Sequence, residues 1–231
     1  MGSQKEYTEL VGPLGPRSSR VEDVAERIRE LVLAGRLPAG TRLSDSALAG
    51  KMGVARNSVR EAFRLLTGEG FLERTGRGVQ VVVPTVEDVE DAFELRLAIE
   101  CRAVRVLAKR GDAEALRELE AIVAEFLDAA RDGNAVETTA LDLRFHEAVC
   151  RLTGSRRLHT VFTREVVKML ALLQMDSDIY APLSDWVDEL PQVVEAIRAG
   201  EPDVASAAME HHIERARTIT LLYAARQEEP G

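Results

Sequence analysis

The sequence predicts a mainly α-helical protein in two parts: a small N-terminal domain of three helices and a β-hairpin, and a larger all-helical bundle. Apolar residues recur with the 3.6-residue helical period along most of the 231-residue chain. The exception is the β-branched run Val79–Val83, which Pro84 closes because proline cannot continue a β-ladder. With 45% hydrophobic residues, the chain can bury a sizeable core, and its length fits two domains.

Charge divides the chain at the same place. Residues 17–84 carry 12 Lys/Arg and 8 Asp/Glu, a net of +4, whereas residues 85–231 carry 17 and 29, a net of −12. A basic module joined to an acidic one suits a nucleic-acid-binding head on a body with another task, although the whole chain has a net charge of −9. We expect a flexible arm at residues 1–16 and domains at 17–84 and 85–231.

Three helices are expected in the first domain. The first spans Arg20–Ala34, and the second spans Leu43–Met52 with Ser44 as its N-cap. The turn Met52-Gly53-Val54 leads into the third helix, which ends near Gly68. One apolar face of this third helix is formed by Val54, Val59, Phe63 and Leu66.

A β-hairpin should follow, with Phe71-Leu72 in a first strand, Thr75–Gly78 in the turn and Val79–Val83 in the second strand. A helix pair with a tight turn, followed by a hairpin, is the order of a winged helix-turn-helix, in which a helix enters the DNA major groove. The alternative is an ordinary small α+β domain with a solvated charged face. The order of the elements favours DNA binding.

Basic and amide side chains crowd at and just after the start of the third helix, as expected of a helix that reads DNA. The candidate DNA contacts there are Arg56, Asn57, Ser58, Arg60 and Arg64. In the hairpin turn, Arg77 would reach the DNA backbone or the minor groove.

The chain after Pro84 is predicted to be helical throughout. Thr85-Val86-Glu87-Asp88 resembles a capping box at the start of the first helix. Six helices with short loops and apolar stripes make a helical bundle. Their expected ranges are Asp88–Arg110, Ala113–Arg131, Val136–Leu152, Leu158–Met175, Asp185–Ala199 and Pro202–Ala225.

A metal site is one interpretation of the bundle's histidines. Asp142 and His146 lie four residues apart on one helical face, where a carboxylate and an imidazole can share a metal ion. His212 falls on the apolar stripe of the last helix and should point inward, whereas His211 falls outside it. An inward histidine is more often a hydrogen-bonded core residue than a ligand. A metal-dependent hydrolase with a metal-activated water is a further alternative.

The stretch LPAGTRLSDSALAGKMGVARNSVREAFRLLTGEGFLERTGRG resembles the winged helix-turn-helix of GntR-type bacterial transcriptional regulators. The matching positions are Gly40, Leu43, Leu48, Ala49, Gly53, Val54, Arg56, Val59, Arg60, Glu61, Ala62, Leu65, Glu69 and Gly70. Ala55 stands where Ser is usual, Asn57-Ser58 replace Thr-Pro, and Phe63 replaces Leu. These departures fall on or next to base-reading positions, so they affect which operator sequence is expected rather than which fold. The resemblance also implies that Ser46 holds a phosphate and that Gly76 and Arg77 enter a groove.

The helical part is similar to the FadR-type C-terminal effector (FCD) domain of these regulators. The resemblance rests on D-x-x-F-H at Asp142–His146, A-I-x-x-G at Ala196–Gly200 and A-x-x-x-H ending at His212. It implies a ligand-responsive transcriptional repressor rather than an enzyme. Such a protein binds a near-palindromic operator as a homodimer and responds to an organic acid or acyl effector.

Many members of this family hold zinc or nickel with one Asp and three His, beneath a small carboxylate. Three of these ligands match Asp142, His146 and His212. Leu190 stands where the remaining histidine is expected, and we expect Pro191 to push Leu190 out of helical geometry. Either three protein ligands suffice with water or effector, or Glu189 replaces the fourth, or the site is vestigial and the effector apolar. A regulator that responds to metal alone is a further alternative.

The resemblance also implies effector-binding residues. Arg96 and Glu100 share a face in the R-x-x-[LI]-E arrangement of the family, where Arg96 would line the cavity and grip a carboxylate bidentately. The alternative is an i,i+4 surface ion pair worth a few tenths of a kcal/mol. Arg144 is a further candidate, although its side chain could point outward.

Localisation follows from what the sequence does not contain. No apolar run approaches the roughly 20 residues needed to span a bilayer. The N-terminal arm lacks the apolar segment of a signal peptide. Cys101 and Cys150 lie within helical patterns and are interpreted as small buried apolar side chains rather than a disulfide. We therefore expect a cytoplasmic protein.

Overall fold

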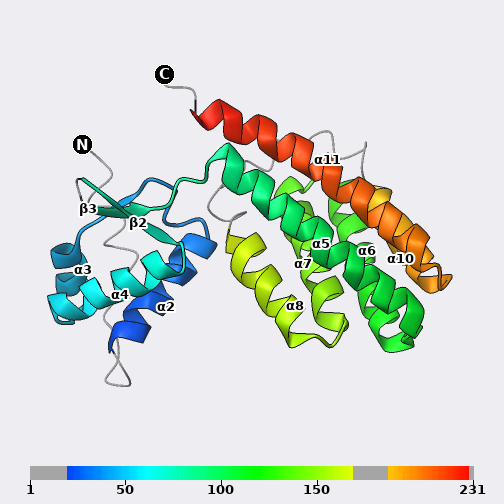
Figure 1. Cartoon of the computed structure of the whole chain (residues 1–231), viewed down its shortest axis with the longest axis horizontal. Coiled ribbons are helices and arrows are strands. Elements are labelled where there is room, and N and C mark those ends of the chain that lie inside the picture. The colour runs from blue at the N-terminus through cyan, green and yellow to red at the C-terminus, as the bar shows by residue number, and fades with distance from the viewer. Residues whose placement is uncertain (1–19, 77, 169–186, 229–231) are drawn as a thin grey trace. The chain divides into compact units, whose positions relative to one another are not determined.

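The computed structural model describes residues 20–76, 78–168 and 187–228, and the chain divides between Pro84 and Thr85 into two compact units (Figure 1). The N-terminal unit, called the head below, contains helices α2 (Arg20–Leu33), α3 (Asp45–Met52) and α4 (Arg56–Gly68). It also contains strands β1 (Arg42–Leu43), β2 (Leu72–Thr75) and β3 (Gly78–Val81). The predicted mainly α fold, with a winged helix-turn-helix before a helical domain, is confirmed.

Apolar side chains from all three helices and the sheet form one core in the head. Val24 and Ile28 of α2 and Val59 and Leu66 of α4 have no exposed surface. These positions recur at the spacing of one helical face, so burial against a common core fixes which face of each helix points inward. The outward face of α4 is thereby left to its basic residues.

Strand β1 is a difference from the prediction. Leu43 was expected to begin the second helix, but it pairs with Val79 in the sheet order β1-β3-β2. Ser44 has an extended backbone and its hydroxyl accepts the Ala47 amide, so the N-cap itself separates the strand from the helix. Leu43 is buried at the strand position. The second hairpin strand is also shorter than expected, ending at Val81.

Helix α4 starts without a side-chain cap, since Ala55 occupies its N-cap position. We expect Ala55→Ser to raise the free energy of local unfolding of α4 by about 1 kcal/mol, because a hydroxyl at this position can accept a backbone N–H. Amide hydrogen exchange of the α4 residues in the full chain measures the effect. Ser44→Ala, which removes an existing cap, should weaken α3 protection by a similar amount. Unchanged α4 protection in the serine variant would contradict the expectation.

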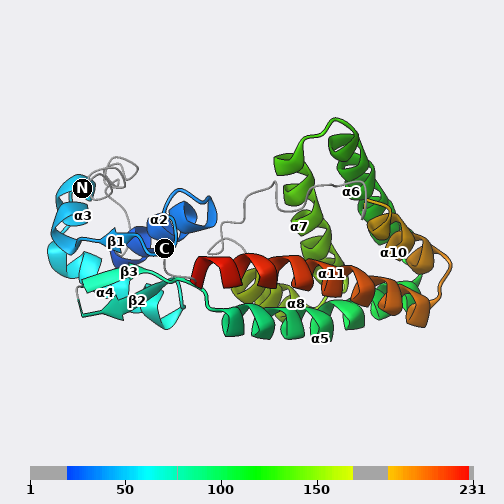
Figure 2. The same ribbon diagram turned by 90° about the horizontal axis from the view of Figure 1, so that it is seen from above.

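The described residues of the C-terminal unit, called the helical domain, form helices joined by short turns and contain no strand. The helices are α5 (Val86–Arg110), α6 (Ala113–Arg131), α7 (Ala135–Leu152), α8 (Arg156–Val161), the π-helix η1 (Phe162–Val167), α10 (Glu189–Arg198) and α11 (Pro202–Glu228). The predicted capping box is present, because Thr85 accepts the Asp88 amide while Asp88 accepts the Thr85 amide. Helices α5 and α11 lie side by side in both views (Figure 1 and Figure 2), and α6 packs against α7.

Two predicted details of the helical domain are wrong. The helix expected at Leu158–Met175 starts at Arg156 behind the cap Ser155 and widens into a π-helix, and its end lies outside the described residues. Leu190 is helical despite Pro191. Pro191 is the third residue of α10, where no intrahelical hydrogen bond needs its N–H, and the full burial of Leu190 favours the helical conformation.

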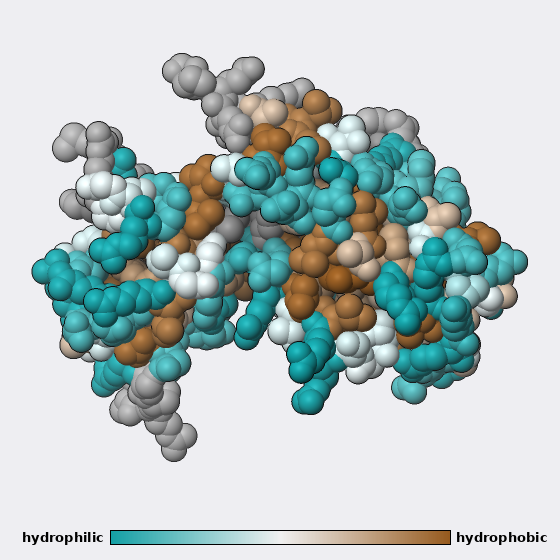
Figure 3. Space-filling model, in the orientation of Figure 1, coloured by the Kyte–Doolittle hydropathy of each residue, from teal (hydrophilic) through white to brown (hydrophobic). Residues whose placement is uncertain are grey.

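The surface of both units is largely polar. Hydrophilic side chains cover much of the face seen in Figure 3, with apolar residues exposed between them. On α11 the exposed apolar residues include Val204 and Leu222. None of the described helices is both long and apolar enough to cross a membrane.

Candidate functional site

Helix α4 presents its basic residues on the outer face of the head. Arg56, Asn57, Arg60 and Arg64 are exposed, while the apolar residues between them enter the core. Ser58 is half-buried. Because the core fixes one face of α4, the opposite face carries a row of guanidinium groups one helical turn apart, as a DNA-reading helix requires.

Asp45, the first residue of α3, connects two of these arginines. Its Oδ1 lies 2.9 Å from Arg56 Nε and its Oδ2 lies 2.6 Å from Arg60 Nε. The hydrogen bond from Arg56, together with that from Arg60, lowers the pKa of Asp45 to about 2. The carboxylate is therefore ionised at any physiological pH, and it bridges the two helices of the helix-turn-helix.

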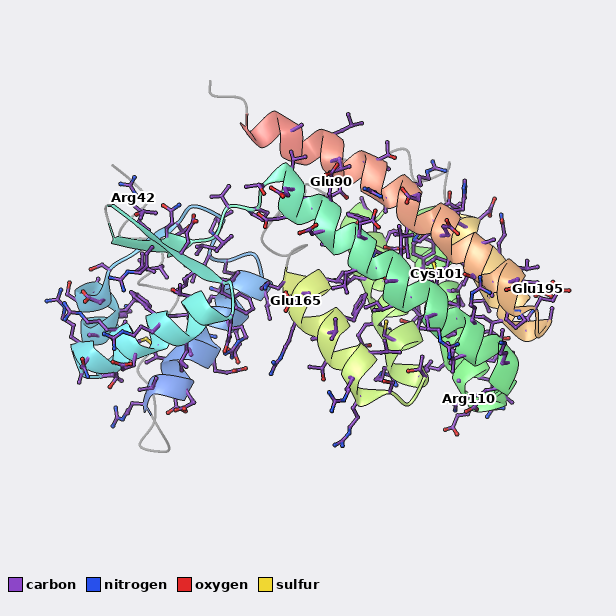
Figure 4. All side chains as sticks on the ribbon, viewed as in Figure 1. Arg42, Glu90, Cys101, Arg110, Glu165 and Glu195 are labelled. Atoms are coloured by element: carbon purple, nitrogen blue, oxygen red, sulfur yellow. The ribbon has the colours of Figure 1, made fainter. Side chains whose placement is uncertain are left out.

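A groove of about 820 Å³ lies between α4 and the sheet of the head. Four arginines line it: Arg42, Arg60, Arg64 and Arg74. Arg42, which is labelled in Figure 4, and Arg74 were not predicted as site residues. Arg42 belongs to the unpredicted strand β1, and both residues are exposed on strands that pair with β3. Strand β1 is too short, and the burial along β2 too irregular, for an alternating pattern to have identified them.

Two of the remaining predicted DNA contacts, Ser46 and Gly76, are exposed on the head. Ser46 is exposed and its hydroxyl lies 3.0 Å from that of the N-cap Ser44. Gly76 is exposed in the hairpin turn. Arg77 lies outside the described residues.

In the helical domain, Asp142 and His146 of α7 meet His212 of α11, so the sequence-predicted cluster is brought together. One ligand atom from each of the three lies within 4.8 Å of the others. The two Nε2 atoms of the histidines are 3.1 Å apart. Asp142 Oδ1 lies 3.2 Å from His212 Nε2, and Asp142 Oδ2 lies 3.6 Å from His146 Nε2. His211, by contrast, is exposed.

A carboxylate contacts the Nδ1 atom of each histidine, on the side of the ring that faces away from the cluster. His146 Nδ1 bonds Glu100 Oε2, and His212 Nδ1 lies 2.8 Å from Glu189 Oε2. A carboxylate at Nδ1 fixes a proton there, so the neutral form of each ring has its lone pair on Nε2. Both Nε2 atoms and the Asp142 carboxylate then face one point, which is the arrangement that metal-binding histidines use.

The charges of the cluster fit a cation at that point. Burial would lower the pKa of His212, but the adjacent carboxylates of Asp142 and Glu189 raise it to about 9. Burial lowers the pKa of His146, which leaves that ring neutral. In the described part of the chain, Asp142 Oδ1 is buried and makes no well-aligned hydrogen bond, although His212 Nε2 lies 3.2 Å away. The residues therefore fit a divalent metal ion with oxygen and nitrogen ligands.

We expect zinc binding at pH 7 to release about one proton. His212, with a pKa of about 9, carries a proton at pH 7, and a metal can bind only the neutral ring. Zinc affinity should therefore rise by about tenfold per pH unit up to pH 9. Calorimetric titration in two buffers of different ionisation enthalpy measures the released proton. Identical heats in both buffers would show that His212 is already neutral.

Glu189 and Arg215 complete the environment of His212. Glu189 Oε1 lies 2.9 Å from Arg215 Nη1. Glu189 contacts the outer nitrogen of His212 and so supports the ring rather than replacing the missing fourth ligand. Leu190, at the fourth ligand's expected position, is fully buried. Arg215 was not predicted, although it follows His212 by three residues and so shares its helical face.

Arg96 and Glu100 form a buried pair, so the surface alternative is wrong. Their side chains are 3% and 0% exposed, and Arg96 Nε lies 2.8 Å from Glu100 Oε1. Arg96 also stacks over Phe93, with 5.1 Å to the ring centroid. Arg144 lies away from the cluster, because it is halfway around α7 from Asp142 and His146. It is exposed and pairs with Glu125 at 2.6 Å, so we withdraw it as an effector ligand.

The two cysteines carry free thiols. Cys150 is buried, as predicted, and burial raises the pKa of its thiol above the usual range. Cys101 on α5 (Figure 4) is only half-buried, and burial raises its pKa as well. Both thiols are therefore protonated and unreactive near neutral pH.

Two protein-family models match the chain. Residues 20–82 match the gntR family of bacterial regulatory proteins, and residues 91–215 match the FCD domain. A protein of Paenarthrobacter nicotinovorans named as a probable D-xylose utilization operon transcriptional repressor is 30% identical, over 82% of this chain and 85% of its own. The gluconate operon transcriptional repressor of Bacillus licheniformis is 23% identical, over 81% of this chain and 79% of its own.

Among solved structures, a GntR transcriptional regulator from Rhodococcus sp. RHA1 is similar with a TM-score of 0.72. It is 26% identical, and the match covers 88% of this chain and 98% of that chain. The similarity thus extends over both units.

Proposed function

Because this chain belongs to the gntR family of bacterial regulatory proteins and carries an FCD domain, we propose that it is a ligand-responsive repressor of the FadR subfamily. It binds a near-palindromic operator as a homodimer, and a small acid bound in the helical domain changes that binding. The observation that carries this proposal is the presence, in one chain, of an arginine-lined α4 and an Asp-His-His cluster whose two histidines are buried. The family consists of transcriptional regulators, so the hydrolase alternative has no support.

In the head, α4 enters the major groove. Arg56 and Arg60 donate to guanine O6 and N7, and Asn57 and Ser58 contact bases or backbone. The groove beside the sheet holds the phosphate backbone, to which the exposed Arg42 and Arg74 of the sheet contribute positive charge. Further phosphate and groove contacts come from Ser46, Arg64, Gly76 and Arg77.

In the helical domain, the metal ligands are Asp142, His146 and His212. The family and the fit of the cluster support zinc or nickel, which would supply a positive charge to which an anionic effector can bind. Arg96 adds a second buried positive charge near the cluster, with Glu100 balancing it. The relatives include regulators of gluconate and xylose genes, so a sugar acid or another hydroxy acid is the effector class that we propose.

Coupling between the two units follows from linkage. If an effector changes operator affinity by some factor, the operator changes effector affinity by the same factor. The coupling free energy is typically about 1–3 kcal/mol. A gel shift with the protein's own upstream DNA, with and without chelator and a panel of hydroxy acids, tests the proposal. Retarded DNA that one acid releases is expected, and release should require the metal. DNA that is not retarded at any concentration would contradict the proposal.

We expect Arg60→Ala to weaken operator binding by about 1–3 kcal/mol, that is, by roughly 5- to 150-fold, while leaving the melting temperature unchanged. Fluorescence anisotropy on operator and on unrelated DNA separates two roles. Loss on the operator alone assigns Arg60 to base reading, and equal loss on both assigns it to phosphate contact. Arg27→Ala is the matched control, because Arg27 is a half-buried residue of α2 that pairs with Glu30. Unchanged operator affinity in the Arg60 variant would remove Arg60 from the interface.

A further inference from the structure

One acidic residue lies among the arginines that face DNA. Asp45 begins α3, whereas Arg56 begins α4 and Arg60 follows one turn later. The two oxygens of a single carboxylate contact the two arginines separately, at 2.9 Å and 2.6 Å. The Asp45 side chain is 19% exposed, less than half the exposure of either arginine. Asp45 thus joins α3 to two residues of α4, whereas the ion pair between Arg64 and Glu61 lies within α4.

The contacts use one particular donor of each guanidinium group. Both distances are to Nε, which is one of the five N–H donors of an arginine. The donors of the two terminal NH2 groups are not consumed by Asp45. Those groups are the ones that can reach guanine O6 and N7 end-on. Since a guanidinium group is planar, a bond at Nε also restricts the plane in which the terminal groups lie.

The Asp45 carboxylate reduces both the repulsion between the two arginines and their binding to phosphates of arbitrary DNA. Two guanidinium groups one helical turn apart repel each other, and a carboxylate between them reduces this repulsion. Long, mobile arginines also bind the phosphates of any sequence, and a carboxylate beside them competes with those phosphates. Asp45 can have both effects because it contacts both arginines. Its negative charge is also stabilised in the first turn of α3 by the helix dipole.

We propose that Asp45 is a positioning residue for sequence reading. Its carboxylate holds Arg56 and Arg60 in the orientation that reads guanines, and it reduces their binding to phosphates of arbitrary DNA. The proposal rests on the DNA-binding function proposed above. It assigns operator specificity to a residue that itself carries the wrong charge for contact with DNA.

The test measures base preference with the full chain. Wild type, Asp45→Asn, Asp45→Glu and Glu69→Gln each select DNA from a randomised pool, and anisotropy then gives their affinities for the selected operator and for unrelated DNA. Asp45→Asn removes one negative charge but nearly keeps the side chain's shape. Glu69→Gln is the matched control, because it removes the same charge from an exposed pair with Arg29 elsewhere in the head.

For Asp45→Asn we expect the ratio of operator to unrelated affinity to fall at least about tenfold, with weaker guanine preference at the positions read by the two arginines. Affinity for unrelated DNA should rise. Asp45→Glu should retain most of the preference, and Glu69→Gln all of it. A wild-type preference profile in Asp45→Asn would overturn the proposal, as would an equal loss of affinity for all DNA, which would indicate a folding role. A wild type that selects no sequence would instead refute the DNA-binding function.

Discussion

Glu100→Ala should lower the free energy of unfolding of the helical domain by about 3–5 kcal/mol. The Glu100 side chain is fully buried and its two oxygens bond Arg96 and His146. Burial would raise the pKa of Glu100, but the hydrogen bond from His146, together with the charge and hydrogen bond of Arg96, lowers it below its usual value, so the residue is an anion in the folded state. Its removal leaves a buried guanidinium group without this carboxylate, and it releases the His146 ring from its orientation.

Chemical denaturation of the full chain, monitored by circular dichroism, measures this loss. Glu94→Ala is the control, since Glu94 lies on the same helix α5 but is exposed where it pairs with Arg217. Exposed ion pairs contribute about 0–1 kcal/mol, so this variant should be nearly as stable as wild type. Equal stability of the two variants would show that the buried pair is not a structural element.

Leu190→His should have opposite effects with and without metal. In chelator, a histidine in place of a fully buried leucine loses apolar contacts and should cost about 1–3 kcal/mol. With zinc at a hundred times its dissociation constant, binding to the native state adds about 2.7 kcal/mol, and a fourth ligand should tighten the site further. The zinc-induced rise in melting temperature should therefore be larger than in wild type.

Ile197→His is the matched control, because Ile197 is buried two turns further along the same face of α10. It should lose stability in chelator but gain no more from zinc than wild type does. If wild type shows no zinc effect and Leu190→His only loses stability, the proposed metal site is wrong. The effector is then an apolar compound held by Arg96 and the apolar side chains of the surrounding helices.

The helices were predictable from local patterns and the short strand was not. A helical stripe such as that of α2 and a capping box such as that at Thr85 are properties of neighbouring residues, and both are present. Strand β1 has two residues, and it exists only because β3, more than 30 residues later, offers it a partner. A two-residue strand has no periodicity that a sequence could reveal.

The candidate site shows the same division. Asp142 and His146 were predictable because a spacing of four places them on one face, and the apolar stripe of α11 placed His212 inward. Three contacts join residues far apart in the chain: Glu100 to His146, Glu189 to His212 and Asp45 to the α4 arginines. No single-sequence pattern connects such pairs, so the orientation of both histidines and of both arginines required the folded structure.

Footprinting of the full chain on its own upstream DNA tests the central claim, sequence-specific binding by a dimer, most directly. We predict two protected half-sites related by two-fold symmetry, with centres about 10 base pairs or a multiple of this apart. Protection should require roughly 5- to 150-fold more protein with Arg60→Ala, and it should change when the effector acid is added with metal. The absence of any protected sequence, or protection of a single unpaired half-site, would contradict it.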